Sequence, residues 1–172
     1  AREAAAAAAE GFGGRAVAIR VNPADSRHYG EDVVAVRRSA ADFVLLAKAE
    51  SAKQVADAAW LMTKPVLAMV ETPRAVIEAA AIAAASRGLV AGTNDLAAGL
   101  GVSPGAGRSG LVYALQRIVL AARAAGVAAF DGVYNRLDAD TGLAAECEEG
   151  RSFGFDGKSV IHPSQIEAVN EA

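Results

Sequence analysis

Residues 43–73 read FVLLAKAESAKQVADAAWLMTKPVLAMVETP, and this stretch decides the fold class. An aliphatic run at residues 43–50 precedes residues 51–62, in which the apolar side chains recur at helical spacing, and a second aliphatic run follows at residues 65–71. A strand, a helix and a strand in this order form a unit with parallel strands, because the helix carries the chain back along the sheet. The stretch therefore predicts a βαβ unit.

The same alternation extends along the whole chain. Six aliphatic or β-branched runs end in polar clusters and are separated by Ala-rich stretches; they cover residues 16–22 (AVAIRVN), 43–50 (FVLLAKAE), 65–71 (PVLAMVE), 89–95 (LVAGTND), 127–134 (VAAFDGVY) and 158–162 (KSVIH). Their starts lie about 22 to 38 residues apart, which is the length of a strand, a helix and two short loops. We therefore expect an α/β fold with a parallel sheet.

Several local signals place the helices. Ser51 stands where an N-cap is expected, and Pro73 follows the third run closely enough to lie in a first helical turn. Trp60 is expected to pack against the core. Residues 101–110 (GVSPGAGRSG) are too rich in Gly and Pro for a helix and form either a ligand-covering loop or an ordinary connection. A helix is expected over residues 111–125.

Composition and charge limit the function classes. The 172 residues are 53% apolar and only 5% aromatic, so a core of small aliphatic side chains is expected. The net charge of −3, without a basic stripe, argues against nucleic acid as a partner. No run approaches the roughly 20 apolar residues that cross a bilayer, so no membrane partner is expected. Cys147 is the only cysteine, which fits a reducing compartment and predicts a cytoplasmic location.

Polar residues gather where the predicted strands end. In a parallel sheet the loops after the strands meet at one edge, where binding and catalytic groups collect. Charged groups inside apolar strands are costly to bury unless they are paired or bound to a metal. The residues at these ends are Arg20, Asn22, Lys48, Glu50, Glu71, Thr72, Asn94, Asp95, Asp131 and His162. This edge is the predicted functional site.

Glu71 and Asp95 come from adjacent predicted strands and offer an oxygen-rich, negatively charged pocket. Mg²⁺ prefers a few carboxylates, with water or substrate oxygens completing its coordination. Two interpretations stay open, because the same carboxylates can cap the following helices or pair with Arg20 or Lys48.

Arg20, Lys48 and Glu50 are the other chemical candidates. The planar guanidinium of Arg20 suits a substrate carboxylate, and its alternative is an ion pair inside the fold. Lys48 and Glu50 are expected to share one strand face, where they either act in catalysis or neutralise each other. His162 is expected to be structural, and Cys147 has no basic neighbour in sequence to activate it as a nucleophile.

The motifs at the strand ends resemble those of a known family. RVN (20–22), LAKAES (46–51), VETP (70–73), GTNDLA (92–97), FDGVYNRLDAD (130–140) and GFDGKSVIHPSQI (154–166) are together similar to the citrate lyase beta-subunit branch of the HpcH/HpaI aldolases. The resemblance runs from about Arg15 to the end of the chain. It implies a Mg²⁺-dependent TIM-barrel (β/α)8 lyase, commonly a trimer or hexamer. Such enzymes break or form a carbon–carbon bond between an acyl-CoA and a 2-keto acid.

The resemblance also implies roles for single residues. Arg20 matches the arginine that holds the substrate carboxylate, and Glu71 and Asp95 match the two metal ligands. Lys48 and Glu50 match a site in or beside the catalytic pocket.

Three further positions complete the comparison with the family pattern. Asp131 falls on an aspartate that lines the substrate pocket. Asn94 stands where the family usually has an acidic residue, and Ala75 stands where it often has glycine. No general acid or base is assigned.

The resemblance also indicates that the chain length corresponds to only part of a barrel. A closed barrel takes about 250 residues, so 172 residues hold about six of its eight units. We expect residues 1–172 to form one partial barrel domain, with two strands before Ala1 and a further segment after Ala172. The expected activity is cleavage of a citryl-, malyl- or citramalyl-CoA type substrate to acetyl-CoA and a 2-keto acid. A CoA-independent pyruvate aldolase and a non-catalytic CoA-ester-binding paralogue are the alternatives.

Overall fold

The computed structural model describes residues 1–103, 107–137 and 141–172. Its six strands form one sheet in chain order, and every neighbouring pair is parallel. The strands are β1 (Ala18–Val21), β2 (Phe43–Leu46), β3 (Val66–Val70), β4 (Gly88–Ala91), β5 (Ala128–Asp131) and β6 (Gly157–Lys158). The predicted parallel α/β fold is confirmed.

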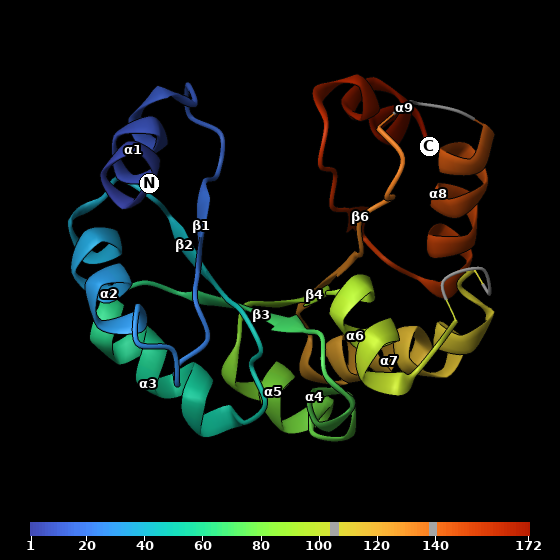
Figure 1. Ribbon diagram of the computed structural model, residues 1–172, viewed down its shortest axis with the longest axis horizontal. Helices are drawn as coiled ribbons and strands as arrows, with labels where there is room; N and C mark the ends of the chain where they lie inside the picture. The colour runs from blue at the N-terminus through green and yellow to red at the C-terminus, as the bar shows by residue number, and fades with distance from the viewer. Residues whose placement is uncertain (104–106, 138–140) are drawn as a thin grey trace.

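Helices connect the strands and cover one side of the sheet. They are α1 (Arg2–Ala8), α2 (Tyr29–Arg38), α3 (Ala52–Met62), α4 (Pro73–Ile77), α5 (Ala79–Ala85), α6 (Thr93–Leu100), α7 (Val112–Ala125), α8 (Thr141–Phe153) and α9 (Ile166–Glu171), with 3-10 turns η1 (Ala9–Gly11), η2 (Ser109–Leu111) and η3 (Pro163–Gln165). Figure 1 shows the sheet curving with the helices on its outer side, so that the edge strands β1 and β6 face each other across its concave side. This is the arrangement of six consecutive units of a (β/α)8 barrel, as predicted.

The two faces of the sheet carry different side chains. On the helix-facing side, Val44, Ala68, Leu89 and Ala129 are fully buried and belong to one hydrophobic cluster with the helices. The concave side carries Arg20, Leu45 and Leu67, which are paired in register, and further along Met69, Val90 and Phe130. Because successive side chains alternate between faces, a strand supplies side chains both to the core and to the concave side.

Several helix signals are confirmed. The Ser51 hydroxyl accepts a hydrogen bond from the Gln54 backbone N–H at the start of α3. Pro73 begins α4, whose N-cap is Thr72. The prediction for Trp60 is wrong, because α3 packs through its opposite face and leaves the indole 78% exposed.

The ends of four predicted strands are also wrong, and one of them is the fifth, which ends at Asp131 and not at Tyr134. Lys48 has a φ of 48°, in the left-handed region, so β2 ends at Leu46 and Lys48 and Glu50 lie in the following loop. They therefore do not share a strand face. The fourth strand ends at Ala91, and Asp95 lies in the first turn of α6.

The sixth strand is much shorter than predicted, and His162 lies beyond it. Only Gly157 and Lys158 pair with β5. The Ile161 backbone N–H donates instead to the side-chain oxygen of Gln165, which turns the chain away from the sheet.

The expected loop at residues 101–110 is described only in part, because residues 104–106 lie outside the described ranges. The helix expected after it begins at Val112, preceded by η2. Within the described residues, no helix has both the length and the apolar character needed to cross a bilayer.

Candidate functional site

Five of the predicted site residues, Asn22 and the four charged ones named next, line one open pocket at the carboxyl ends of the strands. The pocket has a volume of about 340 Å³, and Arg20, Lys48, Glu71 and Asp95 are among its lining residues. They come from β1, the loop after β2, the end of β3 and the first turn of α6. Consecutive βα units therefore deliver two cations and two carboxylates to one place.

Glu71 is the most buried of these charged residues, at 7% exposure. Its Oε1 accepts a hydrogen bond of 2.8 Å from the Lys48 backbone N–H. Burial raises the pKa of the Glu71 carboxyl, and the negative charge of Asp95 raises it further; the Lys48 hydrogen bond and the positive charges of Lys48 and Arg20 act against this rise. Two carboxylates that repel each other beside two cations form a pocket suited to a bound cation and an anionic substrate.

The Glu71 side chain packs closely against the backbone of Gly92. Gly92 joins β4 to α6, and its N–H donates to the Val70 carbonyl at 3.0 Å. A Cβ on Gly92 would overlap the Cβ of Glu71 and lie 2.8 Å from its Oε2. Only glycine leaves Glu71 its present place.

Asp95 and Lys48 are held more loosely. The Lys48 Nζ lies 3.5 Å from Asp95 Oδ2, and both side chains are about half exposed. An ion pair this accessible contributes less than about 1 kcal/mol. Both groups can therefore turn to a ligand, and the N-terminal turn of α6 favours the negative charge of Asp95.

Glu50 takes part in a neighbouring contact. Its carboxylate accepts a hydrogen bond of 2.7 Å from the Thr72 hydroxyl. Thr72 follows Glu71 and in turn accepts from the Ala75 N–H, which caps α4. Glu50 therefore holds the residue next to Glu71.

The donor set of this pocket fits Mg²⁺. In the described part of the chain, no three His, Cys, Asp or Glu residues come together as a metal site. Glu71 and Asp95 place two carboxylates in one pocket, and Mg²⁺ commonly takes one or two carboxylates and completes its shell with water or substrate. The pair lacks the three or four ligands typical of a protein-bound zinc.

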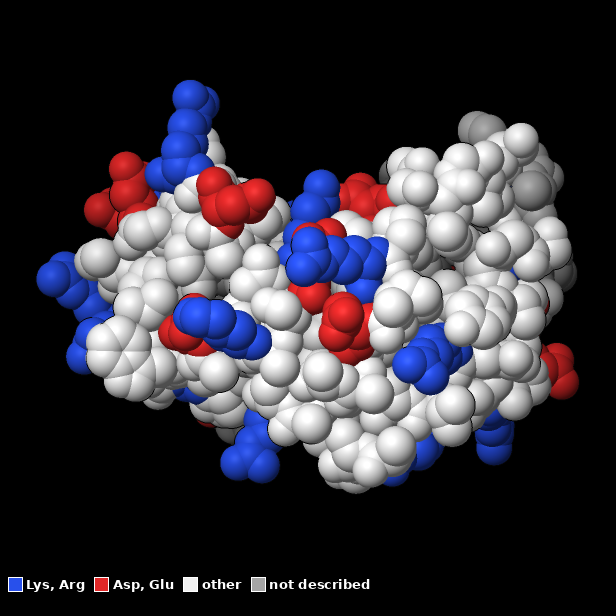
Figure 2. All heavy atoms as spheres, turned by 90° about the horizontal axis from the view of Figure 1, so that it is seen from below, with Lys and Arg blue, Asp and Glu red and all other residues white. Residues whose placement is uncertain are grey.

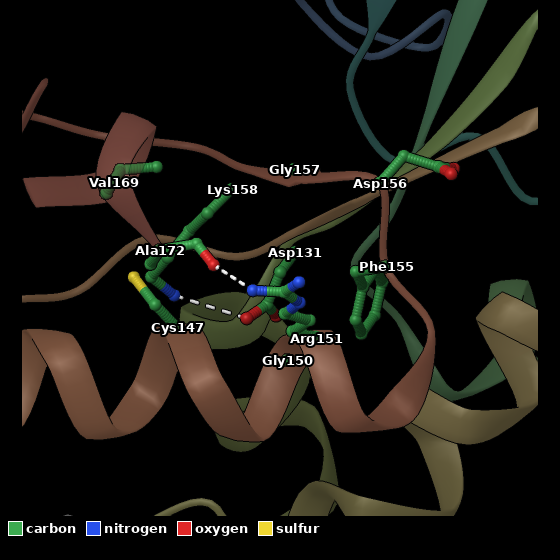
Figure 3. A pocket seen from close by; sticks show the side chains of 10 residues that line it. All are labelled: Asp131, Cys147, Gly150, Arg151, Phe155, Asp156, Gly157, Lys158, Val169 and Ala172. Atoms are coloured by element: carbon green, nitrogen blue, oxygen red, sulfur yellow. Dashed lines mark hydrogen bonds and ion pairs between the residues drawn. The ribbon is translucent and has the colours of Figure 1, made fainter.

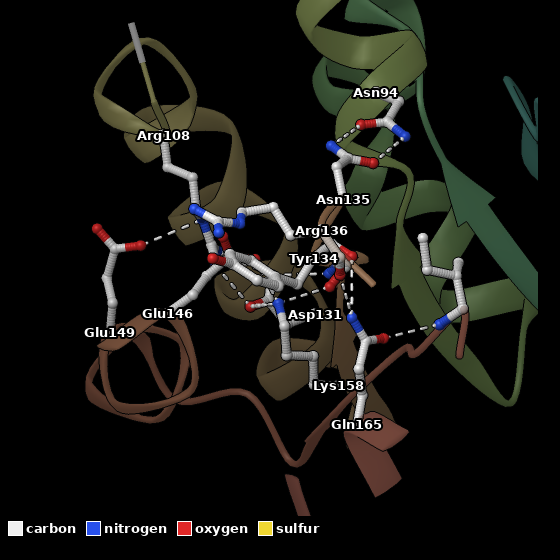
Figure 4. Close-up of polar contacts among 12 residues, drawn as sticks. Asn94, Arg108, Asp131, Tyr134, Asn135, Arg136, Glu146, Glu149, Lys158 and Gln165 are labelled. Atoms are coloured by element: carbon white, nitrogen blue, oxygen red, sulfur yellow. Dashed lines mark hydrogen bonds and ion pairs between the residues drawn. The ribbon is translucent and has the colours of Figure 1, made fainter. Parts of the chain in front are cut away.

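The structure does not bring Asp131 into this pocket. Asp131 lies on the helix-facing side of β5, in register with Lys158, and is 1% exposed. The two terminal guanidinium nitrogens of Arg108 donate to its carboxylate at 2.8 and 2.9 Å, and the Lys158 Nζ donates to its Oδ2 at 3.2 Å (Figure 4). Glu146 and Glu149 of α8 complete this buried cluster as partners of the two cations.

A second pocket, of about 210 Å³, lies beside this cluster (Figure 3). Cys147 and Lys158 line it together with Asp131. Burial raises the pKa of the Cys147 thiol, which agrees with the expectation that it is not a nucleophile. His162 is exposed, and its Nδ1 accepts from the Ser164 N–H in the turn before α9.

Sequence reasoning missed Arg108 and Lys158. Lys158 stands in the predicted sixth strand, and a buried aspartate on the neighbouring strand calls for a nearby cation. Arg108 gave no such signal, because it lies in a Gly- and Pro-rich stretch and meets Asp131 only through the fold.

Replacing Gly92 tests the close approach to Glu71. We expect Gly92→Ala to lower the free energy of unfolding by about 1–3 kcal/mol through overpacking. It should also weaken Mg²⁺ binding by at least about tenfold, because Glu71 must move. Urea unfolding and titration calorimetry measure the two effects. Gly30→Ala is the matched control, since a Cβ there meets no atom within 4 Å; unchanged Mg²⁺ affinity in Gly92→Ala would contradict this account.

Removing the carboxylate of Asp131 tests the buried cluster. Asp131→Ala leaves Arg108 and Lys158 without their shared anion, so we expect the free energy of unfolding to fall by about 3–5 kcal/mol. Asp57→Ala removes the exposed i,i+4 pair with Lys53 and should change it by less than about 0.5 kcal/mol. Equal effects of the two substitutions in urea unfolding would rule out this role for the cluster.

Known proteins are similar to this chain over most of its length. The chain is 45% identical over 163 residues to a (3S)-malyl-CoA thioesterase of Cereibacter sphaeroides, covering 93% of this chain and 57% of the relative. It is 35% identical over 167 residues to the citrate lyase subunit beta of Haemophilus influenzae, covering 88% and 57%. The chain thus spans little more than half the length of these curated relatives.

The solved structures show the same fold. RipC from Yersinia pestis superposes with a TM-score of 0.84 at 31% identity, covering 90% of this chain and 74% of that one. The citrate lyase beta subunit from M. tuberculosis, complexed with oxaloacetate and magnesium, superposes with a TM-score of 0.81 at 37% identity, covering 90% and 71%. Residues 1–163 match the family described as HpcH/HpaI aldolase/citrate lyase. The chain belongs to the HpcH/HpaI aldolase/citrate lyase family.

Proposed function

We propose that this chain carries the metal- and keto-acid-binding site of a Mg²⁺-dependent carbon–carbon lyase. The substrate is a 3-hydroxyacyl-CoA of the citryl-, malyl- or citramalyl-CoA type, and the products are acetyl-CoA and a 2-keto acid. The observation that carries this proposal is the convergence of Arg20, Lys48, Glu71 and Asp95 on one pocket. A relative of similar fold is complexed with oxaloacetate and magnesium, and another structure of that protein holds magnesium, acetoacetate and coenzyme A.

Each residue of the pocket has a separate role in this proposal. Arg20 binds the carboxylate of the keto-acid half and fixes its orientation, and Glu71 and Asp95 hold the metal. When bound, Mg²⁺ supplies positive charge where an oxygen of the substrate becomes negative. Lys48, whose side chain is about half exposed, adds an ammonium group to the pocket. Glu50 acts as a positioning residue through Thr72.

The bond changes balance without a further reactant. The substrate hydroxyl loses its proton, and the carbon–carbon bond breaks as the keto-acid carbonyl forms. The electron pair of that bond stays on the acyl-CoA fragment as its enolate, which takes up one proton, so that one proton is lost and one is gained. Arg20 holds the reacting carbon in place throughout. We give Asp131 an indirect role, in which it fixes the end of β5 through Arg108 and Lys158.

Hydrolysis of the same CoA ester is a second candidate function. It is favoured by the 45% identity to a (3S)-malyl-CoA thioesterase. The two activities break different bonds of one substrate. A lyase releases acetyl-CoA and a keto acid, whereas a thioesterase releases free CoA and the hydroxy acid.

Product analysis tests the proposal. With Mg²⁺, the purified protein should release acetyl-CoA from at least one of citryl-, malyl- and citramalyl-CoA. Glu71→Gln and Asp95→Asn should each lower kcat/KM by at least about a hundredfold, because each removes stabilisation of the developing charge. Asp57→Asn, in the exposed pair on α3, is the control.

The outcomes separate the alternatives. Undiminished activity in both variants would disprove the metal assignment. Free CoA with malate identifies a thioesterase, and turnover of CoA-free hydroxy-keto acids identifies a pyruvate aldolase. Binding of the CoA ester without any product identifies a non-catalytic paralogue.

We further propose that residues 1–172 act as one partial barrel domain, in a cytoplasmic homo-oligomer that is a trimer or hexamer. Large apolar side chains stand exposed on the outer helices: Trp60, Ile77, Tyr113 and Leu120. Figure 2 shows the lower face of the molecule as mostly uncharged, with charged side chains in scattered groups. These exposed apolar side chains support the proposal, because a contact between subunits would remove their apolar surface from water.

Light scattering tests the oligomer. The measured molar mass should be that of a trimer or hexamer. The double variant Trp60→Glu, Leu120→Glu should lower this mass towards that of a monomer, because it places charges in the contact between subunits. Val34→Glu on α2 changes an exposed apolar residue elsewhere and serves as the control. A monomeric mass for the unchanged protein would contradict the proposal.

A further inference from the structure

The turn that carries Asp95 has no side-chain cap of its own. α6 begins at Thr93 after Gly92, which lacks a side chain to bind the first N–H groups of the helix. The ion pair that the structure gives Asp95 is the long, half-exposed contact to Lys48. The place of the Asp95 carboxylate is therefore set by the backbone of this turn.

The loop after β5, residues 132–137, braces the turn at two points. Gly132 lies so close to Thr93 that a Cβ on it would stand 2.5 Å from the Thr93 hydroxyl oxygen. Asn94 and Asn135 form a reciprocal amide pair: Asn94 Nδ2 donates to Asn135 Oδ1 at 2.9 Å, and Asn135 Nδ2 donates to Asn94 Oδ1 at 2.7 Å (Figure 4). The pair joins the first turn of α6 to a segment 41 residues further along the chain.

The same loop is fixed from its other side. Gln165 is completely buried; its Nε2 donates to the Arg136 carbonyl at 2.5 Å, and its Oε1 accepts from the Ile161 N–H at 3.1 Å. The Ser164 hydroxyl donates to the Leu137 carbonyl at 2.7 Å. A satisfied, buried amide is a rigid support. Contacts therefore run from Gln165 through the loop to Asn135, Asn94 and the backbone of Asp95.

We propose that Asn94 and Asn135 act together as positioning residues that hold Asp95 opposite Glu71 for Mg²⁺ binding. The proposal rests on the function proposed above for Glu71 and Asp95. Each amide supplies one donor and one acceptor, so both bonds form only with an amide of the same reach on the other side. Asn94 also keeps the position beside Asp95 uncharged, so that the pair can form without repulsion.

Mg²⁺ binding by the full chain tests the pair without reference to turnover. Asn94→Ala, Asn135→Ala and the double variant are titrated with Mg²⁺ alone in a calorimeter, and thermal unfolding is recorded in parallel. We expect each single variant to bind Mg²⁺ about tenfold more weakly, because the turn loses its brace. The double variant should be no weaker than either single one, since the first substitution already removes the pair.

The midpoint of thermal unfolding should change little, because both side chains are exposed. Asn170→Ala, which removes an exposed amide on α9, is the control and should leave Mg²⁺ affinity unchanged.

The outcomes distinguish this inference from the function on which it rests. Mg²⁺ binding that is lost in Glu71→Gln but unchanged in both asparagine variants overturns the positioning role alone. Losses that add in the double variant overturn the paired action. Loss of Mg²⁺ affinity in proportion to a fall in unfolding temperature overturns the specific role in favour of general stabilisation. An unchanged protein that does not bind Mg²⁺ overturns both proposals.

Discussion

The hydrogen bond from the Lys48 backbone to the buried Glu71 carboxylate is the contact on which the pocket depends. A carboxylate at this depth is costly to ionise, as the raised pKa of Glu71 records. The left-handed backbone of Lys48 brings its N–H to the carboxylate, and the absent side chain of Gly92 gives the carboxylate room. Residues from three consecutive βα units thus fix the position of one carboxyl group.

Two polar centres lie on opposite faces of the same sheet. Glu71 and Arg20 belong to the pocket at the strand ends, whereas Asp131 and Lys158 lie under α8 on the helix side. The first centre is open and unevenly paired, with a weak contact between Lys48 and Asp95. The second is buried, and its carboxylate accepts hydrogen bonds from two nitrogens of Arg108. The weak contact leaves Lys48 and Asp95 available to a ligand, whereas the several hydrogen bonds to Asp131 give that carboxylate a structural role.

The sequence predicted the order and direction of the six strands, because each aliphatic run is long and each is followed by a helical pattern. It predicted the residues of the open pocket through the strand ends and the family motifs together. Its predictions failed where one backbone angle sets the end of a strand, and where the alternation of side chains along a strand sets the face on which a residue lies. Periodicity gives no sign of the φ of Lys48, and Asp131 faces the helices because it is one residue beyond Phe130, which points inward. Arg108 could not be predicted, since only the folded chain brings it to Asp131.

Each strand in the sheet pairs with the strand that precedes it in the chain. Every ladder therefore joins neighbouring segments of the chain, and closing the loop between them costs less entropy than pairing strands far apart in the sequence would. A chain made from its N-terminus can therefore add one βα unit at a time to an existing edge during synthesis. The pocket would be assembled in the same order: Arg20 first, then Lys48 and Glu71, and Asp95 only when α6 has formed.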